Sequence, residues 1–162
     1  MTGKTDEVEP TGQAARDQRL LDDLDIATSI DELSEHASAV CTDAAHAASV
    51  CATTGWATEH FSLAGTSQVT QWCIASARVL GTCADLLREH AADGQGHLLV
   101  AQARAGLVAA QECAAACEPY EDTDPLRAEC AAACRRAAQA LRGVITAMTP
   151  RSGDPALRSS AT

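Results

Sequence analysis

Four stretches of helix length carry small apolar residues in alternating steps of three and four, and this periodicity constrains the fold more than any other feature. The same face of an α-helix recurs at these steps, so each stretch predicts a helix with one buried stripe. Aromatic residues make up only 2% of the chain, which disfavours the core of a β-sandwich or barrel. Because short breaks separate the stretches, the sequence predicts an all-α protein, an antiparallel up-down-up-down four-helix bundle with disordered termini.

Local signals set the expected ends of the first and last helices. Ser29 and Glu32 fit a capping box, so the first helix is expected to begin there and to stop at Gly55. The fourth helix has Asp124 as its expected N-cap and Pro125 at its first position, where the missing amide costs nothing.

The remaining boundaries follow from glycine-rich breaks and from composition. The second and third helices are expected over about 66–92 and 97–120. The chain then divides into a flexible N-terminal tail (1–28), a bundle with a cysteine-lined core (29–149) and a flexible C-terminal tail (150–162).

All eight cysteines fall on or beside the predicted inward stripes, two on each helix. They are Cys41, Cys51, Cys73, Cys83, Cys113, Cys117, Cys130 and Cys134. One or two could serve as small apolar side chains, but eight are hard to explain where alanine or valine would pack as well. In a reducing compartment, thiols in such number are more often metal ligands than disulfides. The sequence therefore predicts a metal-binding core with all eight as candidate ligands.

Two pairs of cysteines stand four residues apart, Cys113 with Cys117 and Cys130 with Cys134, so each pair points from one helix face. Thiolates select soft ions such as Cu(I) and Zn(II). A single zinc site needs four ligands, which these four cysteines could supply, but the other four would then have no role. A column of spread thiols favours several Cu(I) ions, each held by two or three sulfurs.

The segment ECAAACEPYEDTDPLRAECAAACRRAAQALR, residues 112–142, resembles the cysteine-rich four-helix-bundle family that includes the bacterial copper storage proteins. The resemblance extends over about residues 30–148 and is specific in the last two helices, where the two CxxxC pairs match the family's pattern. It implies Cu(I) held by thiolates inside the bundle. The chain carries fewer cysteines than that family's typical members, so the resemblance implies a lower capacity.

The thiols are expected to be densest at the end of the bundle that holds the first and third connections. Cys51 and Cys117 lie nearest that end in the predicted arrangement, and His60 lies in the connection above them. We therefore count His60 among the candidate metal ligands, and we expect copper to arrive at this end. The far half is expected to be filled by leucines.

A copper-dependent oxidase or oxygenase is an alternative interpretation. It would use a mixed Cys/His copper site at His60, walled by the aromatic residues near it, and it would make the protein a copper-dependent oxidoreductase. These aromatic residues are Trp56, Phe61, Trp72 and Tyr120. The preferred interpretation of these aromatic residues is that they cap the open end of an alanine-rich bundle.

A disulfide-stapled helical interaction protein is the second alternative. Nine residues separate Cys41 from Cys51, and nine separate Cys73 from Cys83, a spacing that resembles twin Cx9C hairpins. The CxxxC pairs of the last two helices resemble twin Cx3C hairpins in the same way. Both kinds of hairpin join two antiparallel helices through paired disulfides.

The net charge and the lack of long apolar stretches limit the kinds of partner that we expect for this protein. A formal net charge of -10 argues against binding to nucleic acid, which needs a basic face. No stretch approaches the length of a membrane span, and the first ten residues do not resemble a signal peptide, so we expect a cytoplasmic protein without membrane contact. The expected partners are copper ions and a protein that donates or accepts them. A bundle this rich in alanine also suits pairing with a second copy of itself.

Overall fold

The computed structural model describes a chain that is almost entirely helical. Its backbone is described for residues 12–60, 68–90 and 96–149, and its side chains for 16, 18, 19, 29–55, 68–89 and 96–149. The elements in chain order are α1 (Gly12–His60), α2 (Gln68–His90), α3 (Gly96–Cys117), the short 3-10 helix η1 (Glu118–Tyr120) and α4 (Pro125–Met148). No strand occurs among the described residues, so the expected all-α class is confirmed.

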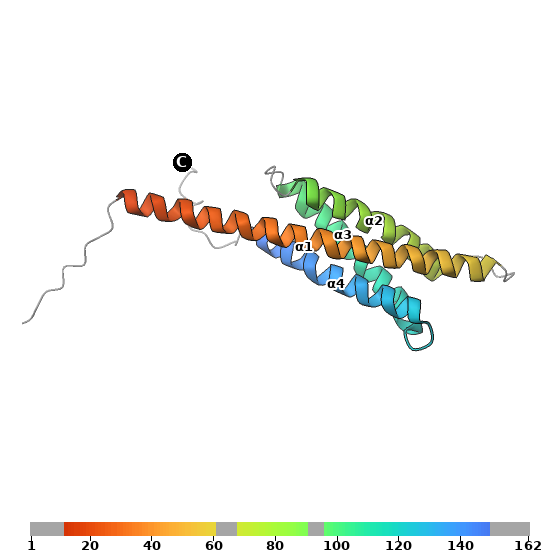
Figure 1. The fold of residues 1–162 in the computed structure, drawn as a ribbon. Coiled ribbons are helices and arrows are strands. Elements are labelled where there is room, and N and C mark those ends of the chain that lie inside the picture. Colours follow the sequence, from red (N-terminus) through yellow and green to blue (C-terminus); the bar gives the residue numbers. More distant parts are fainter. Residues whose placement is uncertain (1–11, 61–67, 91–95, 150–162) are drawn as a thin grey trace, which may run out of the picture.

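The four helices pack as an antiparallel bundle (Figure 1). Helix α1 contacts α2 and α4, and α3 contacts the same two helices, so α1 and α3 lie across a diagonal of the bundle. The up-down-up-down arrangement is therefore confirmed. The end at which α3 passes through η1 into α4 is called the η1 end below, and α1 also finishes at that end (Figure 1).

Helix α1 is longer than the sequence signals indicated. It begins at Gly12, not at Ser29, so Ser29 and Glu32 lie inside the helix and their interpretation as a capping box is wrong. No glycine or proline interrupts the chain between Gly12 and Gly55, so nothing in the backbone chemistry stops the helix there. The first part of α1 projects past the other three helices (Figure 1).

Gly55 does not end α1, which continues to His60. A Cβ atom at Gly55 would lie 2.7 Å from the Thr70 Oγ1 atom of α2. The glycine therefore permits a close approach of the two helices and is not a C-terminal stop, although a lone glycine in a helical pattern often marks one.

The start of α4 agrees with its sequence signal. The Asp124 carboxylate accepts hydrogen bonds from the backbone amides of Leu126 (3.0 Å) and Arg127 (3.4 Å), and Pro125 occupies the first turn. The expected N-cap is confirmed.

Helix α3 ends three residues earlier than expected, because the chain tightens into η1 from Glu118 onward.

Two buried serines fix how the helices lie along one another. The Ser38 hydroxyl of α1 donates to the Ala84 carbonyl of α2 (2.7 Å), and the Ser76 hydroxyl of α2 donates to the Ala109 carbonyl of α3 (3.0 Å). A buried hydroxyl that lost its acceptor would cost about 1–3 kcal/mol, so these bonds disfavour sliding of one helix past its neighbour.

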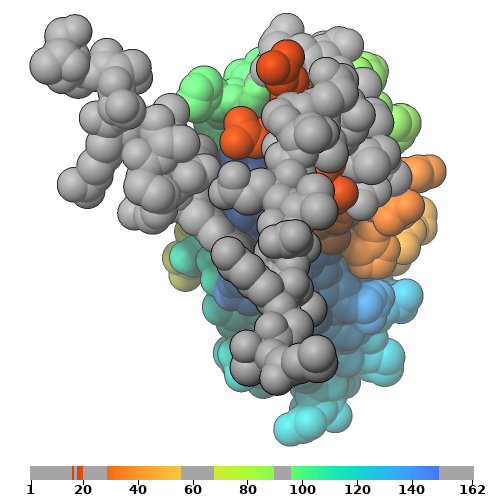
Figure 2. Space-filling view, turned by 90° about the vertical axis from the view of Figure 1, so that its left-hand side faces the viewer, coloured from red at the N-terminus to blue at the C-terminus, as the bar shows by residue number. Residues whose placement is uncertain are grey.

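The core has two chemically different halves. Six of the eight cysteines lie among alanines toward the η1 end, and larger aliphatic side chains, all at most 2% exposed, occupy the core from the level of Cys83 toward the far end: Leu80, Leu87, Leu99, Leu141 and Val144. Figure 2 views the molecule from the end at which α1 begins, and it shows described side chains of α1 (orange) beside those of α4 (blue). The expected leucine-filled far half is confirmed.

Candidate metal centre

All eight cysteines lie in the core as free thiols. Seven have no exposed surface, and Cys51 is 5% exposed. Cys41 is completely buried, whereas its neighbour Val40 is half-buried. The bundle therefore places every thiol inward and leaves Val40 at the edge of the core.

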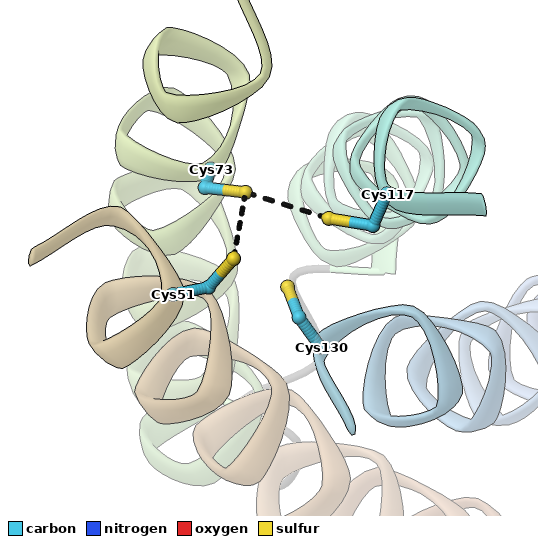
Figure 3. Close-up of side chains that lie close together, drawn as sticks. All are labelled: Cys51, Cys73, Cys117 and Cys130. Atoms are coloured by element: carbon cyan, nitrogen blue, oxygen red, sulfur yellow. Dashed lines mark hydrogen bonds between the residues drawn. The ribbon is translucent and has the colours of Figure 1, made fainter. Parts of the chain in front are cut away.

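Four of these sulfurs form the four-thiol group at the η1 end, one from each helix. They belong to Cys51, Cys73, Cys117 and Cys130 (Figure 3). The Cys73 Sγ atom lies 3.8 Å from that of Cys51 and 3.6 Å from that of Cys117, and all four sulfurs lie within 4.8 Å of one another. The side chains converge on one point between the helices (Figure 3).

A second set, the three-thiol group, joins the four-thiol group through a shared member. It consists of Cys113, Cys130 and Cys134, with sulfurs within 4.8 Å of one another. The Cys113 Sγ atom lies 3.5 Å from that of Cys130 and donates a hydrogen bond to that of Cys73 at 3.8 Å. Six sulfurs therefore form one continuous cluster in which Cys130 belongs to both groups.

Cys41 and Cys83 form a deeper pair toward the middle of the bundle. The Cys83 thiol acts on Cys41 and raises its pKa, and it donates a hydrogen bond to the Gln102 carbonyl at 3.6 Å. Cys41 and Cys83 each stand ten residues, about 15 Å, along their helices from Cys51 and Cys73, so the pair lies farther from the η1 end than the four-thiol group. The predicted column of thiols, dense at one end, is thus present.

The order of the thiols along the column differs in one respect from the sequence expectation. Cys51 and Cys117 were expected nearest the end of the bundle, but the structure groups Cys73 and Cys130 with them. The four thiols expected to suit a zinc site, all from the last two helices, are also not the set that converges. Helix α3 ends at Cys117 and α4 begins at Pro125, so Cys117 and Cys130 lie at the same end of the bundle, with their sulfurs within 4.8 Å.

The connection between α3 and α4 holds these two cysteines in place. The Asp124 amide donates to the Tyr120 carbonyl (2.9 Å), and the Tyr120 ring lies 4.4 Å from the Arg127 guanidinium carbon. Arg135 of α4 forms an ion pair with Glu121. These contacts restrain the segment that separates the last turn of α3 from the first turns of α4.

Gly106 makes room for the deep pair, a role that the sequence did not reveal. A Cβ atom at this position would lie 2.8 Å from the Cys83 Sγ atom and 3.1 Å from Leu141 Cδ1. The available signal was a glycine on the inward stripe of an otherwise alanine-rich helix, where alanine would be the better helix former.

We predict that Gly106→Ala lowers the free energy of unfolding by about 1–3 kcal/mol, because the added methyl group overpacks the core against Cys83 and Leu141. Gly81→Ala is the matched control: nothing lies within 4 Å of its added Cβ. That control should raise stability by up to about 1 kcal/mol through helix propensity. Urea unfolding of the two variants checks this, and equal stabilisation in both would contradict the role given to Gly106.

Burial and sulfur contacts shift the pKa values of the thiols in opposite directions. The hydrogen bond with Cys83, then burial, raise the pKa of Cys41. Hydrogen bonds with Cys113 and Cys117, together with burial, raise the pKa of Cys130. Hydrogen bonds from Cys113 and Cys130 lower the pKa of Cys117 by stabilising its thiolate. Some of these cysteines therefore lose their thiol proton more readily than others. A metal ion that binds here must displace the protons of the cysteines that are still protonated.

The histidines and aromatic residues do not form a mixed site among the described side chains. His36, His46 and His97 are exposed. His60 is the last residue of α1, but its side chain lies outside the described residues, so its part as a ligand stays a prediction. The side chain of Trp56 and all of Phe61 also lie outside them.

Two of the aromatic residues expected near His60 can be placed. Trp72 and Tyr120 are exposed, at 40% and 42%. Tyr120 packs against Arg127 and does not face the thiols as a wall of a pocket would. The described aromatic residues therefore add no ligand and no cavity wall to the cysteine cluster.

Comparison of the chain with protein-family models, with curated proteins and with solved structures finds no match. Among the described helices, none combines the length and apolar character that crossing a membrane requires. What the site can do therefore follows from its own geometry: two overlapping groups of buried thiols could hold metal ions, and a further pair lies below them.

Proposed function

We propose that this protein binds several Cu(I) ions through its core thiolates and serves in copper storage, buffering or detoxification. The observation that carries the proposal is that eight buried sulfurs line one column. Around the two groups, neighbouring sulfurs approach to 3.5–3.8 Å, and among the side chains that the structure describes no His, Asp or Glu belongs to either set. A donor set made only of thiolates favours a soft ion.

The thiol groups contain different numbers of sulfurs, and this supports Cu(I) over other soft ions as the main metal bound. Cu(I) accepts two or three sulfurs, so it suits both the deep pair of Cys41 with Cys83 and the three-thiol group. Zinc requires four ligands and would leave both of these places incomplete. The resemblance of residues 112–142 to copper storage proteins agrees with this choice, and the reduced set of cysteines agrees with a smaller load.

The surroundings of the thiols suit temporary holding of a reactive ion. Helices that already pack through alanine and leucine keep water away from the sulfurs, and thiols close together exchange a bound ion by short steps. Loading releases protons, because the thiolate is the ligand, so copper affinity should fall as pH falls. A reducing compartment such as the cytoplasm would keep all eight thiols ready for loading.

Anaerobic titration of the reduced apo-protein with Cu(I), against a competing chelator, tests the proposal. We expect uptake of several ions per chain, with native mass spectrometry giving the same number. Replacing both Cys41 and Cys83 with serine should lower the stoichiometry but leave the six-sulfur cluster able to load. Uptake of fewer than two ions per chain would contradict storage and buffering.

A further inference from the structure

The four-thiol group has a geometry that the other thiols lack. Each of the four helices contributes one sulfur to it, from Cys51, Cys73, Cys117 and Cys130. In a tetrahedral zinc site with Zn–S bonds of about 2.3 Å, neighbouring sulfurs lie about 3.8 Å apart, because a tetrahedron's edge is about 1.63 times its centre-to-corner distance. The distances from Cys73 Sγ to its partners, 3.8 Å to Cys51 and 3.6 Å to Cys117, match this edge.

The same distances exclude a regular planar square of these sulfurs. A planar square with sides of 3.6 Å would place opposite corners about 5.1 Å apart, √2 times the side. All four sulfurs lie within 4.8 Å of one another, so they do not form such a square, and the contacts of Cys73 have the length of a tetrahedron's edge. Four sulfurs from four helices therefore stand close to the positions that a tetrahedral divalent ion needs before any ion is bound.

A further thiol supports the group from outside. Cys113 donates a hydrogen bond to the Cys73 sulfur at 3.8 Å and lies 3.5 Å from the Cys130 sulfur. Four thiolates around a divalent ion carry a net negative charge, which is costly in a buried site unless donors face the sulfurs. Hydrogen bonds of this kind orient and stabilise metal ligands elsewhere. Cys113 can provide one without becoming a ligand.

We infer that the four-thiol group is a Zn(II) site, with Cys51, Cys73, Cys117 and Cys130 as its ligands and Cys113 as the donor behind them. One ion fits per chain, since the three-thiol group shares Cys130 and the deep pair has only two sulfurs. The zinc joins all four helices at the η1 end. The inference goes beyond Cu(I) storage, because it assigns a second metal to one defined subset of the thiols.

Titration of the reduced apo-protein with Co(II), and then with Zn(II) against a chromophoric chelator, tests the inference. We expect one equivalent of Co(II) to give the intense visible bands and sulfur-to-cobalt charge transfer of a tetrahedral thiolate site, and one equivalent of Zn(II) to displace it. Pale octahedral Co(II), or no zinc retained by the unsubstituted protein, would overturn the inference without any variant.

Matched variants locate the ion. Cys51→Ser should weaken Zn(II) binding by at least roughly 100-fold, the upper range for disturbing a metal site's supporting contacts. Cys134→Ser is the control, because Cys134 belongs to the cluster but not to the four-thiol group, and it should retain one Zn(II). Equal loss of zinc in both variants would overturn the ligand set, and circular dichroism confirms that each variant is folded.

The two proposals fail separately in these experiments. A protein that takes up several Cu(I) ions but retains no Zn(II) would overturn only the zinc site. A protein that retains one Zn(II) but takes up fewer than two Cu(I) ions would overturn only the storage function.

Discussion

Replacing both Cys51 and Cys117 with alanine should slow the initial rate of Cu(I) loading by roughly tenfold or more, in the range by which disturbed metal sites usually weaken. Both sulfurs lie in the four-thiol group at the η1 end, and Cys51 is the only cysteine with exposed surface, 5%. The far half is closed by leucines. Ions from solvent should therefore meet these thiols first and pass inward by ligand exchange. Stopped-flow transfer from a Cu(I) chelator measures the rate.

The deep pair provides the matched control. Replacing both Cys41 and Cys83 with alanine should lower the final stoichiometry and leave the initial rate nearly unchanged, because these residues lie farther from the η1 end than the cluster. If the two double variants load at the same initial rate, loading from the η1 end is wrong.

Leu87→Ala should lower the free energy of unfolding by about 2–5 kcal/mol, since Leu87 is 1% exposed and its removal leaves a cavity in the leucine-filled half. Leu98→Ala is the control: Leu98 is 51% exposed, and its replacement should change stability by no more than about 0.5 kcal/mol. Denaturant unfolding of the metal-free variants measures both effects.

The same prediction bears on metal removal. Because the leucine-filled half and the cap at Asp124 owe nothing to a metal ion, the chelator-treated protein should keep its helical circular dichroism. Loss of helicity on chelation would show that metal ions, and not aliphatic packing, hold the bundle together.

Periodicity was sufficient to predict the bundle and the inward placement of the cysteines, because both depend on which residues share a helix face. Periodicity was insufficient where either of two adjacent residues could take the buried position on a helix face. Val40 and Cys41 are equally compatible with the α1 stripe, and only contacts with α2 and α4 decide that Cys41 is buried. Helix ends were uncertain for a related reason: Ser29 and Gly55 are common at ends, but neither stops a helix that gains by continuing.

The grouping of the thiols was beyond the sequence because it depends on how the helices align along one another. Spacing within a helix predicted that Cys113 and Cys117 share a face. The antiparallel arrangement put the start of α2 and the end of α3 at the same end of the bundle, but it could not show that Cys73 and Cys117 would reach the same level. That alignment follows from contacts between helices, such as the hydrogen bond from Ser76 to Ala109.

The Ser76 hydrogen bond also has an evolutionary consequence. Ser76 donates to the carbonyl of Ala109, and seven residues further along α2 Cys83 donates to the carbonyl of Gln102, seven residues earlier on α3. Ser76 and Cys83 therefore occupy equivalent positions, one heptad apart, on the face of α2 that packs against α3. A Ser76→Cys substitution, which a single nucleotide change can produce, would add one more thiol to the column. Lineages of such bundles could thus gain or lose metal capacity one heptad at a time while the backbone stays the same.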